Sequence, residues 1–147
     1  MRSQLLSLLA ACVLAVPVAA QGQALQQGNP TDKIICTYTG EILPGQEQAF
    51  RETAAKVVAV VEREPGTLVY RWSMRADGKT FDVVEIYKDS AAVVTHINDV
   101  LPKFGEDLGK MQKATKYVVY GDPDPEARKA IEALHPEYES PFAGFIR

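Results

Sequence analysis

The stretch Glu64–Asn98, EPGTLVYRWSMRADGKTFDVVEIYKDSAAVVTHIN, decides the fold of this 147-residue chain. Residues 67–75 and 81–88 alternate apolar and polar side chains, which is the period-2 pattern of a half-buried strand. Asp77-Gly78 between them is a strong hairpin signal and predicts a type I′ turn with a positive φ at both residues. Asp89-Ser90 then predicts the cap of a helix that follows the second strand at once.

The flanking segments complete a βαββαβ order. Residues 33–39 predict a first strand, and Pro44 is predicted to open a helix with one apolar stripe that ends at Glu64-Pro65-Gly66. After the hairpin we expect a short helix over residues 90–97, a joint at Pro102, a second helical piece, and a last strand over 115–120. We therefore predict an α+β, ferredoxin-like domain over residues 33–121 with a four-stranded antiparallel sheet, followed by a C-terminal helix and tail over 122–147.

The first 20 residues are typical of a secretory signal peptide. Arg2 is followed by an apolar run over residues 5–16 and by small residues at 18–20, and the run is too short to span a bilayer. We expect cleavage near residue 20 and a periplasmic or secreted protein with a flexible leader over residues 21–32; an N-terminal membrane anchor is the alternative. Residues 9–12 resemble a lipoprotein box, but the apolar run continues beyond Cys12, which argues against lipidation there.

Composition excludes several kinds of partner. Removing 20 of the 147 residues leaves 127, and the loss of Arg2 takes the formal net charge from −3 to −4. Basic residues do not cluster with aromatic ones, so we expect no binding to nucleic acid and no membrane association after signal cleavage. Cys36 is then the lone cysteine and is expected to be a buried apolar thiol.

The predicted hairpin has one strongly aromatic face. Pairing across Asp77-Gly78 places four residue pairs on that face: Leu68 with Tyr87, Tyr70 with Glu85, Trp72 with Val83, and Met74 with Phe81. The opposite face carries Val69, Val84 and Ile86, so both faces are too apolar to meet water over their whole area. Helices can cover one face, and a second copy of the sheet is the simplest cover for the other, which predicts a homodimer.

The segment 64–70, the strand around Val83–Tyr87, and Ala91-Ala92 leading to His96 resemble the antibiotic biosynthesis monooxygenase domain, most of all its quinol-monooxygenase-like branch. The resemblance covers roughly residues 33–121. It implies a dimeric α/β barrel and an oxygenase that acts on a small aromatic or quinol-like ligand without metal, flavin or haem. Relatives that degrade haem use an Asn on the first strand and a His on the later helix, and this chain has neither at those places.

The resemblance directs attention to five side chains. His96, Glu85 and Tyr87 are the candidate catalytic groups, because an imidazole or carboxylate could accept a proton and a tyrosine could donate a hydrogen bond. Trp72 and Tyr70 are the candidate substrate-binding groups. Each has a structural alternative: a hydrogen-bonded buried His96, a fixed acceptor or ion-pair partner at Glu85, and core or dimer-interface packing for Trp72 and Tyr87.

The sequence contains no motif for a metal centre or a nucleotide cofactor. Two histidines and no Cys/His cluster argue against a metal centre, and no Gly-rich phosphate loop is present. We therefore expect no cofactor and a secreted monooxygenase-like enzyme. The alternatives are a non-catalytic dimeric module that binds a small ligand or a partner protein, and an isomerase or lyase on the same fold.

Overall fold

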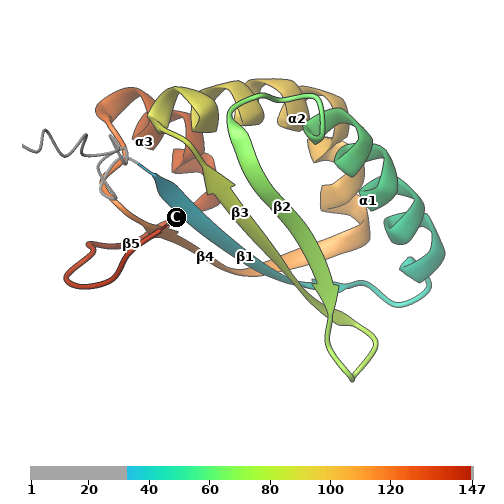
Figure 1. Cartoon of the computed structure of the whole chain (residues 1–147). Helices are drawn as coiled ribbons and strands as arrows, with labels where there is room; N and C mark the ends of the chain where they lie inside the picture. The colour runs from blue at the N-terminus through green and yellow to red at the C-terminus, as the bar shows by residue number, and fades with distance from the viewer. Residues whose placement is uncertain (1–32, 147) are drawn as a thin grey trace, which may run out of the picture.

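The computed structural model describes residues 33–146 and has the predicted βαββαβ order with an extension at its end (Figure 1). The elements are β1 (Ile34–Ile42), α1 (Glu47–Val61), β2 (Thr67–Met74), β3 (Thr80–Tyr87), α2 (Ser90–Met111), β4 (Gln112–Tyr120), α3 (Pro125–Ile131), a 3₁₀ turn (Glu132–Leu134) and β5 (Glu137–Glu139). The predicted signal peptide, leader and Cys12 lie outside the described residues. Within 33–146 no helix is both long and apolar enough to cross a membrane.

The sheet has the strand order β2-β3-β1-β4-β5. The first four strands are antiparallel neighbours, as predicted, and β5 adds a short parallel strand beside β4. All the helices lie on the same side of this sheet in Figure 1. The α+β ferredoxin-like fold is thereby confirmed, and the segment predicted as a tail contributes one strand.

The hairpin register is the predicted one over most of its length. Tyr70 pairs with Glu85, Trp72 with Val83, and Met74 with Phe81. The predicted pairing of Leu68 with Tyr87 is wrong, because Thr67 takes that place and the register shifts before Val69. Leu68 is left without a partner on β3 by this shift and is 48% exposed.

The turn between these strands differs from the predicted type I′. Gly78 has a φ of 73°, but Asp77 does not have a positive φ. The Asp77 carboxylate instead accepts hydrogen bonds from the backbone N–H groups of Lys79 (3.0 Å) and Thr80 (2.8 Å). This side-chain capping holds a longer loop that keeps the same strand register.

Two predicted helix boundaries are also wrong. Pro44 does not open α1, because Gly45 has a φ of 80° and the chain makes a turn before the helix begins at Glu47. Pro102 does not divide α2, which runs unbroken from Ser90 to Met111. Apolar residues before and after Pro102 face the same core, and this packing offsets the lost backbone hydrogen bond.

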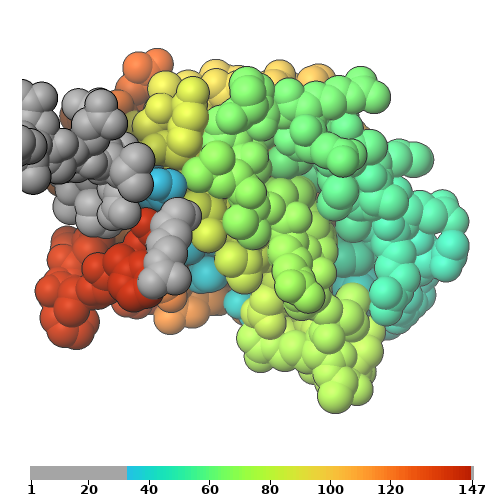
Figure 2. Space-filling view, in the orientation of Figure 1, coloured from blue at the N-terminus to red at the C-terminus, as the bar shows by residue number. Residues whose placement is uncertain are grey.

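The two faces of the sheet have different environments. The aromatic face, with Tyr70, Trp72 and Phe81, packs against α1 and α2. The outer face carries Val69, which is 38% exposed, and the half-buried Ile86. Figure 2 shows atoms of β1 (blue) and β3 (yellow-green) between the β2 hairpin and the C-terminal segment (red). No helix covers this outer face in Figure 1, so it is the face available to a partner.

Candidate functional site

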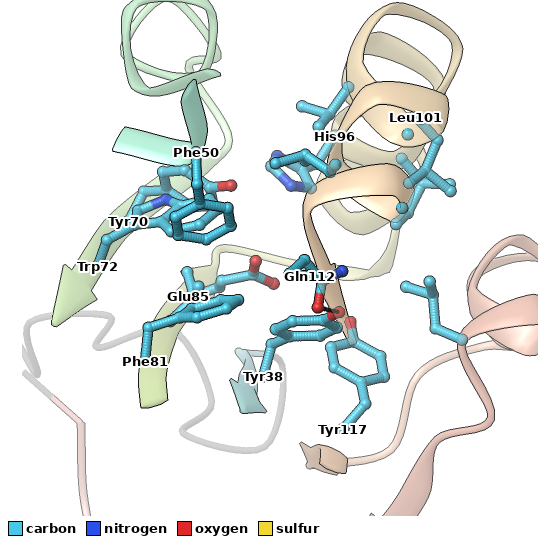
Figure 3. A pocket seen from close by; sticks show the side chains of 17 residues that line it. Tyr38, Phe50, Tyr70, Trp72, Phe81, Glu85, His96, Leu101, Gln112 and Tyr117 are labelled. Carbon is cyan, nitrogen blue, oxygen red and sulfur yellow. Dashed lines mark hydrogen bonds between the residues drawn. The ribbon is translucent and has the colours of Figure 1, made fainter. Parts of the chain in front are cut away.

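A cavity of about 160 Å³ lies between the aromatic face of the sheet and helix α2 (Figure 3). Its walls are mostly apolar, with Phe50 from α1, Trp72 from β2, and Leu101 and Leu108 from α2. Phe50 meets the Trp72 ring edge-on, with ring centroids 5.6 Å apart. The sheet and the helices thus border an apolar space with polar groups at a few places only, which is the usual make-up of a small-molecule site.

Four of the five candidate residues line this cavity: Tyr70, Trp72, Glu85 and His96. Tyr87 does not line it. Its side chain is buried, and its hydroxyl donates a hydrogen bond to Glu85 Oε2 at 2.9 Å. Tyr87 therefore acts on the cavity through Glu85 and through His96, whose ring centroid lies 5.4 Å from that of Tyr87, and it is not itself a lining residue.

His96 is held by a carboxylate that sequence reasoning missed. Its Nδ1 lies 3.0 Å from Oε2 of Glu64, and both side chains are only 5% exposed. The Thr67 hydroxyl donates to the same Glu64 oxygen at 2.7 Å. When Nδ1 donates to Glu64, Nε2 of a neutral imidazole is the acceptor, and it has no hydrogen-bond partner among the described residues. A carboxylate, an oriented imidazole and an apolar cavity form the arrangement used for general base catalysis.

Local structure explains why Glu64 and His96 meet. Asp89 caps α2 by accepting a hydrogen bond from the Ala92 N–H at 2.9 Å, so the helix starts directly after β3. The turn that carries Glu64 lies against this first helical turn, because a Cβ on Gly66 would come within 2.5 Å of the Ala92 Cβ. The glycine of Glu64-Pro65-Gly66 therefore permits the close approach that brings the carboxylate to the imidazole.

Glu85 is the second carboxylate of the site. Burial raises its pKa, and the charge of Glu64 raises it further, while His96 and the hydrogen bond from Tyr87 act in the opposite direction. Figure 3 shows the Glu85 carboxyl group directed into the cavity between Phe81 and His96. A carboxyl group with a raised pKa binds its proton at a higher pH than usual and can then donate a hydrogen bond to a ligand.

We expect Glu85→Gln to change how stability depends on pH. Because the folded-state pKa of Glu85 is raised above its ordinary value of 4.5, the native state binds more protons than the unfolded state just above that pH. Stability should therefore fall as pH rises from about 4.5 through the raised pKa. Thermal melts of Glu85→Gln across this range should show a shallower decline and a higher Tm above it; an unchanged slope would show that Glu85 is not the titrating group.

A second polar pair was also missed by sequence reasoning. The Tyr38 hydroxyl on β1 donates to Oε1 of Gln112, the first residue of β4, at 3.0 Å. Tyr117 lines the cavity next to them. Burial raises the pKa of Tyr38, Tyr70 and Tyr117, so these phenols are neutral hydrogen-bonding groups. The residues come from distant elements, and no local pattern marks them.

Cys36 is buried, as predicted, and does not line the cavity. It is completely buried, and burial raises the pKa of its thiol to about 12. Among residues 33–146, no three His, Cys, Asp or Glu side chains are placed to hold a metal ion. The groups available for chemistry are therefore His96 with Glu64, the Glu85 carboxyl group, and the neutral side chains around them.

These features define an α+β protein with a ferredoxin-like fold and a buried His–Glu pair beside an aromatic cavity. Residues 34–99 match the family model of the antibiotic biosynthesis monooxygenases, which confirms the predicted resemblance. The match includes Glu64, Glu85 and His96 but ends before Gln112. A search of curated protein sequences finds no match to the chain.

Solved structures share the fold. MupZ from Pseudomonas fluorescens aligns with a TM-score of 0.69 at 20% identity, covering 79% of this chain and 95% of MupZ. SnoaB, a cofactor-independent oxygenase from Streptomyces nogalater, aligns with a TM-score of 0.55 at 13% identity, covering 63% of this chain and 95% of SnoaB. A conserved protein from Methanosarcina mazei Go1 aligns with a TM-score of 0.58 at 18% identity, covering 63% of this chain and 95% of that protein.

Proposed function

We propose that this chain is an exported, cofactor-independent monooxygenase whose substrate is a single-ring aromatic diol, a quinol. The observation that carries this proposal is His96: a buried imidazole, oriented by Glu64 and placed on an apolar, aromatic-lined cavity. The monooxygenase family of residues 34–99 supports the reaction class. Export rests on the signal-like residues 1–20 alone.

The size of the cavity supports a single ring. Its volume of about 160 Å³ is close to that of engineered apolar cavities of about 150 Å³ that bind benzene. A fused polycyclic compound would need a larger space. The Phe50 and Trp72 rings can pack against the faces and edges of an aromatic ligand, and this favours a flat ring over an aliphatic chain of the same volume.

The site supplies the proton transfers that such a reaction needs. Nε2 of His96 removes a proton from one phenolic hydroxyl, and Glu64 stabilises the imidazolium that forms. The electron-rich quinolate then gives one electron to O₂, and the superoxide and semiquinone so formed join through a C–O bond at a ring carbon. The imidazolium returns its proton to the outer peroxide oxygen.

Water loss completes the reaction. The O–O bond breaks, the outer oxygen leaves as hydroxide, and the proton on the oxygenated carbon is lost, so that this carbon becomes a carbonyl. For hydroquinone and O₂ the products are one hydroxybenzoquinone and one water, and O₂ is the oxidant. The apolar walls exclude bulk water from the reactive anion and the superoxide.

Oxygen uptake with hydroquinone and its alkylated analogues tests this function. We expect one O₂ consumed per quinol, with no hydrogen peroxide, because the second oxygen atom leaves as water. Peroxide in a one-to-one yield would instead indicate simple oxidation to the quinone. Uptake equal to the protein-free rate would favour the non-catalytic module, and turnover under anaerobic conditions would favour an isomerase or lyase.

A further inference from the structure

We propose that the side-chain amide of Gln112 is a second ligand anchor, which binds the ring oxygen para to the one that His96 deprotonates and so selects 1,4-diols. This inference rests on the proposed function, because it concerns the ligand of the same cavity. It assigns a specificity-determining role to a residue outside the segment that matches the family model.

The Tyr38–Gln112 hydrogen bond orients the amide. Because Gln112 Oε1 accepts the Tyr38 hydroxyl proton at 3.0 Å, the amide nitrogen is left with two N–H donors. No described residue accepts a hydrogen bond from that nitrogen, and Gln112 lines the cavity. An oriented donor without an acceptor, on the wall of an apolar cavity, is suited to a ligand oxygen.

Gly40 provides the room for this amide. A Cβ at Gly40 would lie 2.8 Å from Gln112 Oε1 and 2.6 Å from the Phe81 ring, so the absence of a side chain lets both approach β1 closely. The β1–β4 register also shifts between Thr39 and Gly40. The bulge and the glycine therefore make a fixed place for Gln112 against the sheet.

The strand register places Glu85 and the Tyr38–Gln112 pair at different points along the cavity. Glu85 pairs with Cys36 on β1, and Val83, two residues earlier on β3, pairs with Tyr38. Two residues along a strand span roughly 6.6 Å, so Tyr38, and Gln112 with it, lies further along the cavity than Glu85. Figure 3 shows Tyr38 and Gln112 beside each other, with the Glu85 carboxyl group facing the same cavity. A ring with oxygens at opposite ends can contact His96 with one oxygen and Gln112 with the other, whereas two adjacent hydroxyls both lie at one end of the ring.

Ligand binding can be measured without turnover. Trp72 is the only tryptophan of the chain and lines the cavity, so its fluorescence reports occupancy directly. Under anaerobic conditions we expect the wild-type protein to bind hydroquinone about five- to tenfold more tightly than p-cresol, in which a methyl group replaces one hydroxyl; this is the effect of about one hydrogen bond. Catechol, with adjacent hydroxyls, should bind like p-cresol.

Two variants of Gln112 separate its role from folding. Gln112→Glu keeps an acceptor for the Tyr38 hydroxyl but replaces the N–H donors, and Gln112→Leu removes the polar group altogether. In both we expect the preference for hydroquinone to disappear, with p-cresol affinity changed less than twofold. Gln48→Leu makes the same change on the exposed surface of α1 and should keep the preference.

The outcomes distinguish this inference from the proposed function. Equal binding of hydroquinone and p-cresol by the wild-type protein, a preference that survives in both Gln112 variants, or no quenching by any ligand would overturn the anchor. Oxygen uptake with hydroquinone despite equal binding would overturn the anchor alone. The expected preference without any oxygen uptake would keep the anchor and refute the oxygenase.

Discussion

His96→Asn is expected to lower kcat for quinol oxidation by about a hundredfold or more, because an amide cannot accept the phenolic proton. The buried Glu64 that orients the imidazole would lose its partner at the same time, so Tm must be measured beside the rate. The second histidine of the chain, His135, provides a matched control. It is exposed and has a left-handed φ of 52°, which Asn tolerates, so His135→Asn should leave both rate and Tm nearly unchanged.

A catalytic and a structural His96 give opposite results. If His96→Asn lowers Tm but leaves the rate per folded molecule unchanged, the imidazole is a structural group and the base assignment is wrong. Tyr87→Phe offers a graded comparison, because it removes only the hydrogen bond to Glu85. We expect it to cost about 1 kcal/mol of transition-state or folding free energy.

The second prediction with a large expected effect concerns the homodimer. We propose that two copies pack through the outer faces of their sheets, because Val69 (38% exposed) and Ile86 lie there without a covering helix. Val69→Glu should raise the dimer dissociation constant about a hundredfold or more, since it places an unpaired charge in the interface. Light scattering at micromolar concentration should show a wild-type dimer and a variant monomer.

Val58 supplies the matched control for this test. It is also 38% exposed but lies on α1, away from the outer face. Val58→Glu should therefore leave the dimer intact. A monomeric wild-type protein with this fold, or equal dissociation in both variants, would contradict the proposed interface.

Local patterns predicted most of the fold. The alternation of residues 67–75 and 81–88 fixed which side chains share the aromatic face, because the side-chain period of a strand is two whatever the connecting turn. The register was therefore right for Tyr70, Trp72 and Met74, although the turn type was wrong. Pro102 was misread because helix propensity is local, whereas packing of both halves of α2 on one core is not.

No local sequence pattern marks the residues of the site that sequence reasoning missed, which are Glu64, Tyr38 and Gln112. Glu64 was read as part of a turn, and its partner His96 lies 32 residues further along the chain. Tyr38 and Gln112 are 74 residues apart and meet only because β1 and β4 are neighbours in the sheet. The sequence shows a carboxylate before Pro-Gly, but its burial and its partner depend on the close approach at Gly66. Sequence thus identified lining side chains on both the sheet and α2, and the three-dimensional structure supplied the groups that orient them.

Mass spectrometry of the product formed under oxygen-18 gas tests the central claim most directly. With hydroquinone as substrate we predict one labelled atom in each hydroxybenzoquinone and one in the water, and loss of the labelled product in His96→Asn but not in His135→Asn. A quinone without label, accompanied by labelled hydrogen peroxide, would contradict an oxygenase. Label that enters at the same rate without protein would contradict it equally.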